Sequence, residues 1–65
     1  MNSLEMKVVM KRNQDTQEKL AEALALPVSG VNARINGSIE FRSGEMKLIK
    51  ERYNLSAEDV VNIFF

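Results

Sequence analysis

The sequence predicts an all-α fold of five short helices in a single domain, residues 1–65. Along most of the chain, apolar residues recur at the spacing of a helix with one buried face. No segment alternates apolar and polar residues for long enough to indicate a sheet. Residues that end or start helices, such as Pro27 and the pair Asn36 and Gly37, divide the apolar runs into short segments.

The first helix is predicted over residues 3–12. Leu4 and Val8 are about one helical turn apart, and this spacing predicts that both face the core. Met6 and Val9 are expected beside them. Two polar residues then interrupt the apolar pattern, and we expect the helix to end there.

The second helix is predicted over residues 16–24. Asp15 or Thr16 is expected to cap it, because a short polar side chain at this point accepts hydrogen bonds from the first turn. Asp15 and Glu18 also have the spacing of a capping box. Ala21 lies on the apolar stripe of this helix, and its small side chain allows another helix to approach closely.

The third helix is predicted to begin at Val28. Pro27 cannot continue the helix before it but suits the start of a new one. Val31 and Ile35 are four residues apart and are expected to face the core. The helix is predicted to end at residues 36–37, because Asn and Gly tolerate the left-handed backbone that closes many helices.

Two further helices are predicted in the last third of the chain. A loop leads to them, and Phe41 is expected to anchor this loop in the core. Ser43 is the predicted cap of the fourth helix, which extends to about Tyr53. Ser56 and Asp59 have capping-box spacing, so a fifth helix is predicted from there to the C-terminus.

The second and third helices have the pattern of a helix-turn-helix. Residues 16–37 read T-Q-E-K-L-A-E-A-L-A-L-P-V-S-G-V-N-A-R-I-N-G, which gives two short helices joined by a tight turn. Such a pair needs a small residue where the helices cross, and Ala21 is expected at that point. The outward residues of the third helix are short, so its backbone can approach base edges in a major groove about 12 Å wide.

This stretch resembles the helix-turn-helix of the lambdoid phage repressors and Cro proteins, also called the xenobiotic-response-element family. The likeness lies in T-Q-E-K-L-A at 16–21, in the small residue Ala21 and in N-G at 36–37. The later stretch F-R-S-G-E-M-K-L-I-K-E-R-Y-N-L-S-A-E-D-V-V resembles the last two helices of the family, so the resemblance covers nearly the whole chain. It implies a five-helix lambda-repressor-like domain and a sequence-specific regulator of transcription that binds double-stranded DNA.

The resemblance also implies where the DNA is contacted. The recognition helix, residues 28–36, is expected in the major groove. The implied base contacts are Val28, Ser29, Asn32 and Ala33, and the implied phosphate contacts are Gln17, Asn36, Ser38 and Arg42. Side-chain chemistry agrees, because Asn32 can pair with adenine through two hydrogen bonds and Val28 can contact a thymine methyl group. For Gln17, capping of the second helix is the alternative.

Three basic residues near the start of the chain are candidates for further phosphate contacts. They are Lys7, Lys11 and Arg12. A solvated helix surface is the alternative interpretation, since clusters of charge are common on protein surfaces. Arg34 is expected either to lie along the duplex or to pair with a carboxylate.

The turn between the second and third helices departs from the family pattern. Ala25 stands where family members usually have Gly, so we expect either a left-handed Ala or a different turn. Pro27 stands where a capping Ser or Thr is usual, and the capping hydrogen bond is therefore expected to be lost. Val28 and Ala33 replace the long polar side chains that usually read bases, which shifts specificity toward DNA shape.

The C-terminal end is more apolar than one buried helix face requires. The residues in question are Val60, Val61, Ile63, Phe64 and Phe65, and the candidates for a dimer surface among them are Val61, Phe64 and Phe65. They are expected either to complete the core or to form the surface of a homodimer, since exposed apolar patches often mark interfaces. A dimer would suit DNA binding, because two-fold proteins read two half-sites about 34 Å apart.

The charge of the chain leaves a second function open. Nine basic and nine acidic residues give a net charge of zero, whereas DNA-binding domains more often have an excess of Lys and Arg. The alternative function is a protein-interaction module that has lost DNA binding and instead binds a repressor or another partner. Both functions fit the cytoplasm of a bacterial cell, whether the chain is encoded by the host or by a phage.

An enzyme is not expected. The chain has no His and no Cys, which removes the usual metal ligands and nucleophiles, and its acidic residues form no recognisable pair. No glycine-rich phosphate loop is present. We therefore predict no cofactor, no metal and no small-molecule substrate. No stretch has the ~20 apolar residues of a membrane span, so no membrane partner is expected either.

Overall fold

Five helices and no strand make up the structure, a computed structural model that describes all residues from 1 to 65. The helices are α1 (Ser3–Arg12), α2 (Gln17–Leu24), α3 (Val28–Ile35), α4 (Ser43–Arg52) and α5 (Ala57–Phe64). The prediction of an all-α chain with five helices is confirmed, and each helix begins and ends within one residue of its predicted bounds. None of the helices has the length and apolar character needed to cross a membrane.

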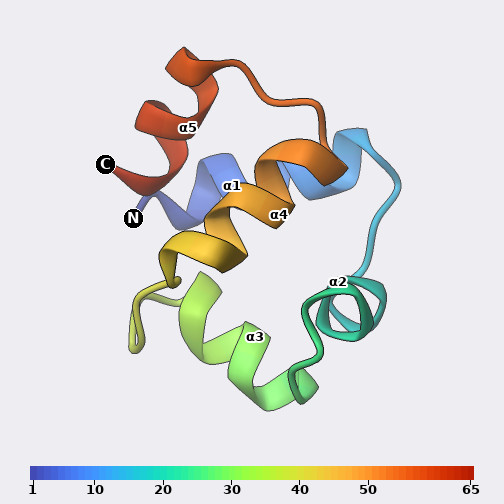
Figure 1. The fold of residues 1–65 in the computed structure, drawn as a ribbon. Helices are drawn as coiled ribbons and strands as arrows, with labels where there is room; N and C mark the ends of the chain where they lie inside the picture. The colour runs from blue at the N-terminus through green and yellow to red at the C-terminus, as the bar shows by residue number, and fades with distance from the viewer.

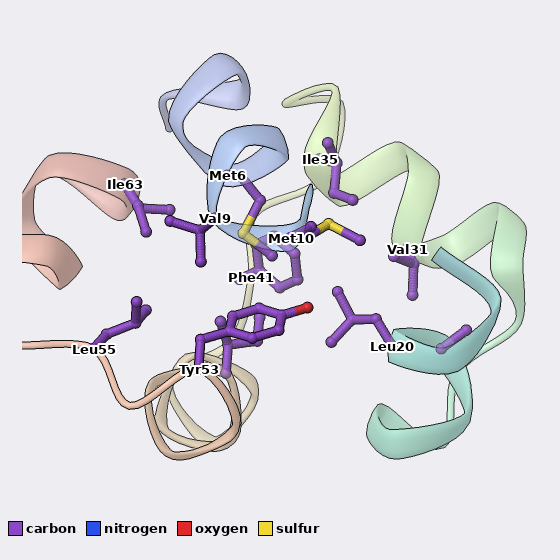
Figure 2. Close-up of a cluster of buried hydrophobic side chains, with 12 residues drawn as sticks. Met6, Val9, Met10, Leu20, Val31, Ile35, Phe41, Tyr53, Leu55 and Ile63 are labelled. Carbon is purple, nitrogen blue, oxygen red and sulfur yellow. The ribbon is translucent and has the colours of Figure 1, made fainter. Parts of the chain in front are cut away.

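One core holds the five helices together. Figure 1 shows α2 and α3 on one side of the molecule and α5 on the opposite side. The two ends of the chain meet beside α5, where the Asn2 amide donates a hydrogen bond to the Ile63 carbonyl at 2.7 Å. Buried apolar side chains from every helix fill the centre (Figure 2). They are Met6, Val9, Met10, Leu20, Ala21, Val31, Ile35, Phe41, Ile49, Tyr53, Leu55 and Ile63.

The buried face of α1 is not the predicted one. Leu4 is 71% exposed and Val8 is also exposed, whereas Met6, Val9 and Met10 are buried. Both sets have helical spacing, so the period alone does not decide between them. The observed face buries three large apolar side chains rather than two, and flexible methionines fill irregular space well. The prediction that Leu4 and Val8 face the core is therefore wrong.

The caps of α2 and α5 follow local hydrogen bonding. The Thr16 hydroxyl accepts a hydrogen bond from the Lys19 amide at 3.2 Å, so Thr16 caps α2 and Asp15 does not. At α5, the Ser56 hydroxyl accepts from the Asp59 amide at 3.1 Å, and the Asp59 carboxylate accepts from the Ser56 amide at 3.0 Å. The predicted capping box at α5 is confirmed.

The start of α4 differs from the prediction. Arg42, with an extended backbone, is the residue before the first turn, and Ser43 is already helical. Ser43 is therefore not the cap. Instead the Glu45 carboxylate reaches back and accepts a hydrogen bond from the Arg42 amide at 3.0 Å. This bond satisfies one backbone donor that a helix start otherwise leaves without a partner.

The apolar C-terminal end divides between the core and the surface. Ile63 is buried, and the ring of Phe64 packs edge-on against Phe41 with 5.6 Å between the ring centroids. Val61 is 55% exposed and Phe65 is 83% exposed. Phe64 thus helps to complete the core, while Val61 and Phe65 remain available for another molecule.

Candidate nucleic-acid interface

The predicted recognition region depends on how α2 and α3 pack. The two helices lie close together, and Ala21 is buried on the inner side of α2. Leu20 of α2 and Val31 of α3 are fully buried and lie near each other in the core (Figure 2). The small side chain of Ala21 leaves room for this approach, as its position in the sequence predicts. The core therefore fixes α3 firmly against α2.

The turn between α2 and α3 contains a left-handed alanine. Ala25 has φ 55° and ψ 42°, and the Leu26 amide donates to the Ala21 carbonyl at 2.9 Å to close the helix end. The first of the two expected alternatives, a left-handed Ala, is therefore the observed one. Pro27 precedes α3 and provides no capping hydrogen bond, also as expected. The amides of Val28 and Ser29 consequently have no acceptor within the chain.

The outward face of α3 is uncharged and combines polar residues with one exposed valine. Val28, Ser29 and Asn32 are exposed, whereas Ala33 is half-buried. The side-chain amide of Asn36 donates to the side-chain oxygen Oδ1 of Asn32 at 3.4 Å. The two residues are one helical turn apart, and the contact is long for a hydrogen bond. The Asn32 side chain keeps its own amide donor and one acceptor position for another molecule.

Arg34, the charged residue of α3, is turned inward. Its side chain is only 8% exposed, and its Nε atom donates to Glu45 Oε1 at 2.9 Å. The expected alternative in which Arg34 pairs with a carboxylate is therefore the observed one. Residues 28–38 contain no acidic residue, so the exposed face of α3 carries no charge of either sign.

Glu45 is charged when it makes this pair. Its partial burial acts to raise the pKa, but the hydrogen bonds from the Arg42 amide and the Arg34 guanidinium outweigh burial and lower the pKa below its usual value. The sequence contains one signal for this role, because Glu at the third position of a helix is typical of capping boxes. The pairing with Arg34 has no local signal, since the two residues lie on different helices.

Gln17 lies at the first position of α2 and is half-buried. Thr16 caps the helix, and the Gln17 side chain makes no hydrogen bond, so the alternative of a capping Gln17 is wrong. The backbone amides of Gln17 and Glu18 have no acceptor within the chain. A helix start with unpaired amides favours an anion such as phosphate.

The segment after α3 supplies the remaining predicted phosphate contacts. Asn36 and Ser38 are exposed, and Arg42 extends from the start of α4 with its side chain exposed. The amides of Ser43 and Gly44 have no acceptor within the chain. Figure 1 shows this segment between α3 and α4, and its buried residue Phe41 packs against Phe64 of α5.

The three basic residues of α1 do not form one surface. All are exposed, but Arg12 lines a hollow of about 220 Å³ together with Asp59 and Asn62 of α5. Lys7 is one turn beyond Ser3, whose hydroxyl donates to the carbonyl of Ile35 at the end of α3. Arg12 is therefore on the side of α1 toward α5, and Lys7 is on the side toward α3. Lys11 lies between them on the outer face.

No family model, curated protein or solved structure matches this chain.

Proposed function

We propose that this chain binds double-stranded DNA in a sequence-specific manner, as a transcriptional regulator similar to the phage repressors and Cro proteins. In this proposal α2 and α3 are the helix-turn-helix, and α3 is the recognition helix that enters the major groove. The observation that carries the proposal is the outward face of α3. It is uncharged and made of short side chains, and it presents the hydrogen-bonding groups of Ser29 and Asn32.

Each exposed residue of α3 has a role that its chemistry supports. Asn32 pairs with an adenine, because its amide offers one donor and one acceptor in the required geometry. Ser29 hydrogen-bonds to a base, and Val28 contacts a thymine methyl group. Ala33 is half-buried and contributes less contact than the other three. With few direct base contacts, DNA shape provides part of the specificity.

Phosphate contacts surround α3 in this proposal. Gln17 and the unpaired amides at the start of α2 bind one phosphate group, and Arg42 with the unpaired amides at the start of α4 binds another. Asn36 and Ser38 lie between these two points along the chain. Lys7 is placed on the α3 side of α1 and adds a cationic contact. Arg12 is left out of the interface, because it lies beside Asp59.

The neutral net charge sets an expectation for salt dependence. Only a few cationic side chains reach phosphate in this proposal, and each neutralised phosphate changes the slope of log affinity against log salt by about −0.9. The expected slope is therefore shallow, about −2 to −3. A second copy of the chain on an adjacent half-site would add affinity without more charge per copy.

The direct test is selection of bound duplexes from a random pool, followed by substitution of Asn32. Asn32→Ala is expected to weaken binding to the selected duplex by roughly 10- to 100-fold and to relax the preference for one base pair. Asn62→Ala is the matched control, because Asn62 is also an exposed helical asparagine but lies on α5. Equal affinities of the two variants for the selected duplex contradict the role of Asn32.

The alternative is a protein-interaction module without DNA binding. The exposed valine at the start of α3 and the zero net charge favour it, because neither attracts phosphate. The same titration separates the two functions. A wild-type chain that binds no duplex at low salt supports the interaction module, whereas salt-dependent binding supports the regulator.

A further inference from the structure

A buried ion pair connects the proposed recognition helix to the start of α4. The side chains of Arg34 and Glu45 are 8% and 14% exposed, and they meet at 2.9 Å. Removing two charges from water is costly, and apolar residues in such places often stabilise a fold equally well. Stability alone therefore gives a weak reason for this pair, and its geometry suggests a more specific role.

The pair belongs to a continuous chain of hydrogen bonds. Glu45 Oε1 accepts from Arg34 Nε at 2.9 Å and from the Arg42 amide at 3.0 Å. The Arg34 Nη1 atom also donates to the carbonyl of Gly30, one turn earlier in α3, at 3.0 Å. One carboxylate oxygen thus joins the body of α3 to the residue that begins α4.

Apolar contacts join α3 and α4 only through the common core, where Ile35 and Ile49 are both fully buried. The backbone of α3 lies close to α2, and its close backbone contacts with α4 are few. The connecting segment is exposed from Asn36 to Glu40, and Phe41 is its buried residue. The hydrogen-bonded chain through Arg34 and Glu45 is therefore the main polar connection between the two helices.

We propose that Arg34 and Glu45 are positioning residues, which hold the recognition helix at a fixed angle to the start of α4. In this arrangement Asn32 reaches a base edge while Arg42 reaches a phosphate on the same duplex. Neither Arg34 nor Glu45 touches the DNA. The inference rests on the proposed DNA-binding function, and it names the residues that fix the interface geometry.

A double-mutant cycle distinguishes positioning from simple stabilisation. The variants are Arg34→Met, Glu45→Gln and the double variant, and both unfolding by urea and affinity for the selected duplex are measured. Glu45→Gln keeps an oxygen that can accept from the Arg42 amide, so it is the milder change. Arg34→Lys is a further variant, because lysine keeps the charge but lacks the planar set of donors that bonds two groups at once.

Each single variant is expected to weaken DNA binding by about tenfold while folded, and the double variant is expected to bind no more weakly than the worse single variant. Ile63→Val is the matched control, because it removes buried volume from the core without removing a hydrogen-bond partner of Arg34 or Glu45. It is expected to lower stability and to leave affinity within about twofold. Full affinity in folded Arg34→Met and Glu45→Gln, or coupling in stability alone, overturns the proposal.

A measurement without DNA separates this proposal from the proposed function. Residual dipolar couplings of backbone amides report the orientation of α3 relative to α4 in solution. In the wild-type chain both helices are expected to fit one alignment tensor, and in Glu45→Gln the couplings of α3 are expected to depart from it. Unchanged couplings in Glu45→Gln overturn the positioning role. Lack of duplex binding by the wild-type chain contradicts the proposed function, and the couplings still decide whether the pair orients α3.

Discussion

Tyr53 donates its phenolic hydroxyl to the carboxylate of Asp15, and this hydrogen bond joins the end of α4 to the turn between α1 and α2. Arg52 donates to the same carboxylate through Nε at 2.9 Å and Nη2 at 3.0 Å. These hydrogen bonds, chiefly those from Arg52, lower the pKa of Asp15 to about 2 against the opposing effect of burial. Burial and the neighbouring carboxylate raise the pKa of Tyr53. The three side chains therefore connect the turn before α2 to the end of α4.

Acid is expected to weaken the fold through Asp15. Its pKa is about 2 in the folded chain, against 3.8 for an ordinary aspartate. Because the folded value is lower, the stabilisation is fully present above about pH 4 and is lost as the pH falls through about 2. The contribution is about 1–2 kcal/mol, less than the full shift implies, because solvent screens the partly exposed Arg52. Urea unfolding followed by circular dichroism at decreasing pH measures it.

The variant Asp15→Asn tests the assignment of this acid dependence. At neutral pH it is expected to lower the free energy of unfolding by about 1–3 kcal/mol, because it loses charge-assisted hydrogen bonds. It is also expected to flatten the decline in stability below about pH 4. Glu51→Gln, on the exposed surface of α4, is the control and is expected to change stability by less than about 0.5 kcal/mol. A decline as steep in Asp15→Asn as in the wild-type chain contradicts the assignment.

The role of Asp15 is one that the sequence alone does not predict. Local spacing made it a candidate cap for the second helix, yet the neighbouring Thr16 caps that helix. Asp15 instead pairs with Arg52, a residue far along the chain. Helix bounds depend on near neighbours and are predicted to within one residue, whereas the cap of α4 is not Ser43 as the sequence predicts. Pairs such as Asp15 with Arg52 depend on how the helices meet, which no local pattern records.

Replacing Ala25 by glycine is expected to stabilise the protein. Ala25 has a left-handed backbone with φ 55°, which costs a residue with a side chain about 1–2 kcal/mol and costs glycine far less. Glycine also loses more conformational entropy on folding, so the expected net gain is about 0.5–1 kcal/mol. Thermal unfolding checks the value. Ala23→Gly, inside α2, is the matched control and is expected to destabilise by about 1 kcal/mol. Destabilisation by both variants contradicts the strain assigned to Ala25.

Replacing Gly30 by alanine is expected to separate stability from DNA binding. A Cβ atom at this position lies 3.3 Å from the Arg34 Nη1 atom, so the guanidinium must shift. The higher helix propensity of alanine is expected to raise the free energy of unfolding by up to about 1 kcal/mol. We expect stability to be unchanged or higher, while affinity for the selected duplex falls several-fold because the Arg34 contacts to Gly30 and Glu45 are disturbed.

The stability control for this experiment is Gly44→Ala. A Cβ atom at Gly44 meets no other atom within 4 Å, so the propensity gain is expected without crowding. If Gly30→Ala binds the selected duplex as well as the wild-type chain, Arg34 does not need its observed position. Affinity and unfolding are measured on the same preparations.

Which faces of α1 and α5 are buried is also not predicted by the sequence pattern alone. Leu4 with Val8, and Met6 with Val9, both have helical spacing in α1, and packing against the other helices decides between them. The sequence of α5 has more apolar residues than one buried face requires, but which of them remain exposed depends on where α5 meets the rest of the core. The sequence thus predicted that a buried face exists, and the tertiary contacts determine its direction.

The exposed end of α5 is expected to mediate a homodimer. Phe65 is 83% exposed, and Val61 is exposed one turn before it. Sedimentation at micromolar concentration is expected to give twice the mass of the chain, and Phe65→Ser is expected to give the monomer. Leu4→Ser is the matched control, because Leu4 is also a largely exposed apolar residue but lies on α1, and this variant is expected to remain dimeric. A wild-type chain that is monomeric both alone and on its duplex contradicts the dimer.

DNA binding through the outward face of α3 is the central claim, and one titration tests it most directly. The wild-type chain is titrated with the selected duplex and with a scrambled duplex of equal composition, at a low salt concentration of about 50 mM. The expected result is saturable binding with a preference of at least about a thousandfold for the selected duplex. Equal affinity for both duplexes, or no binding to either, contradicts the claim that Ser29 and Asn32 read base edges.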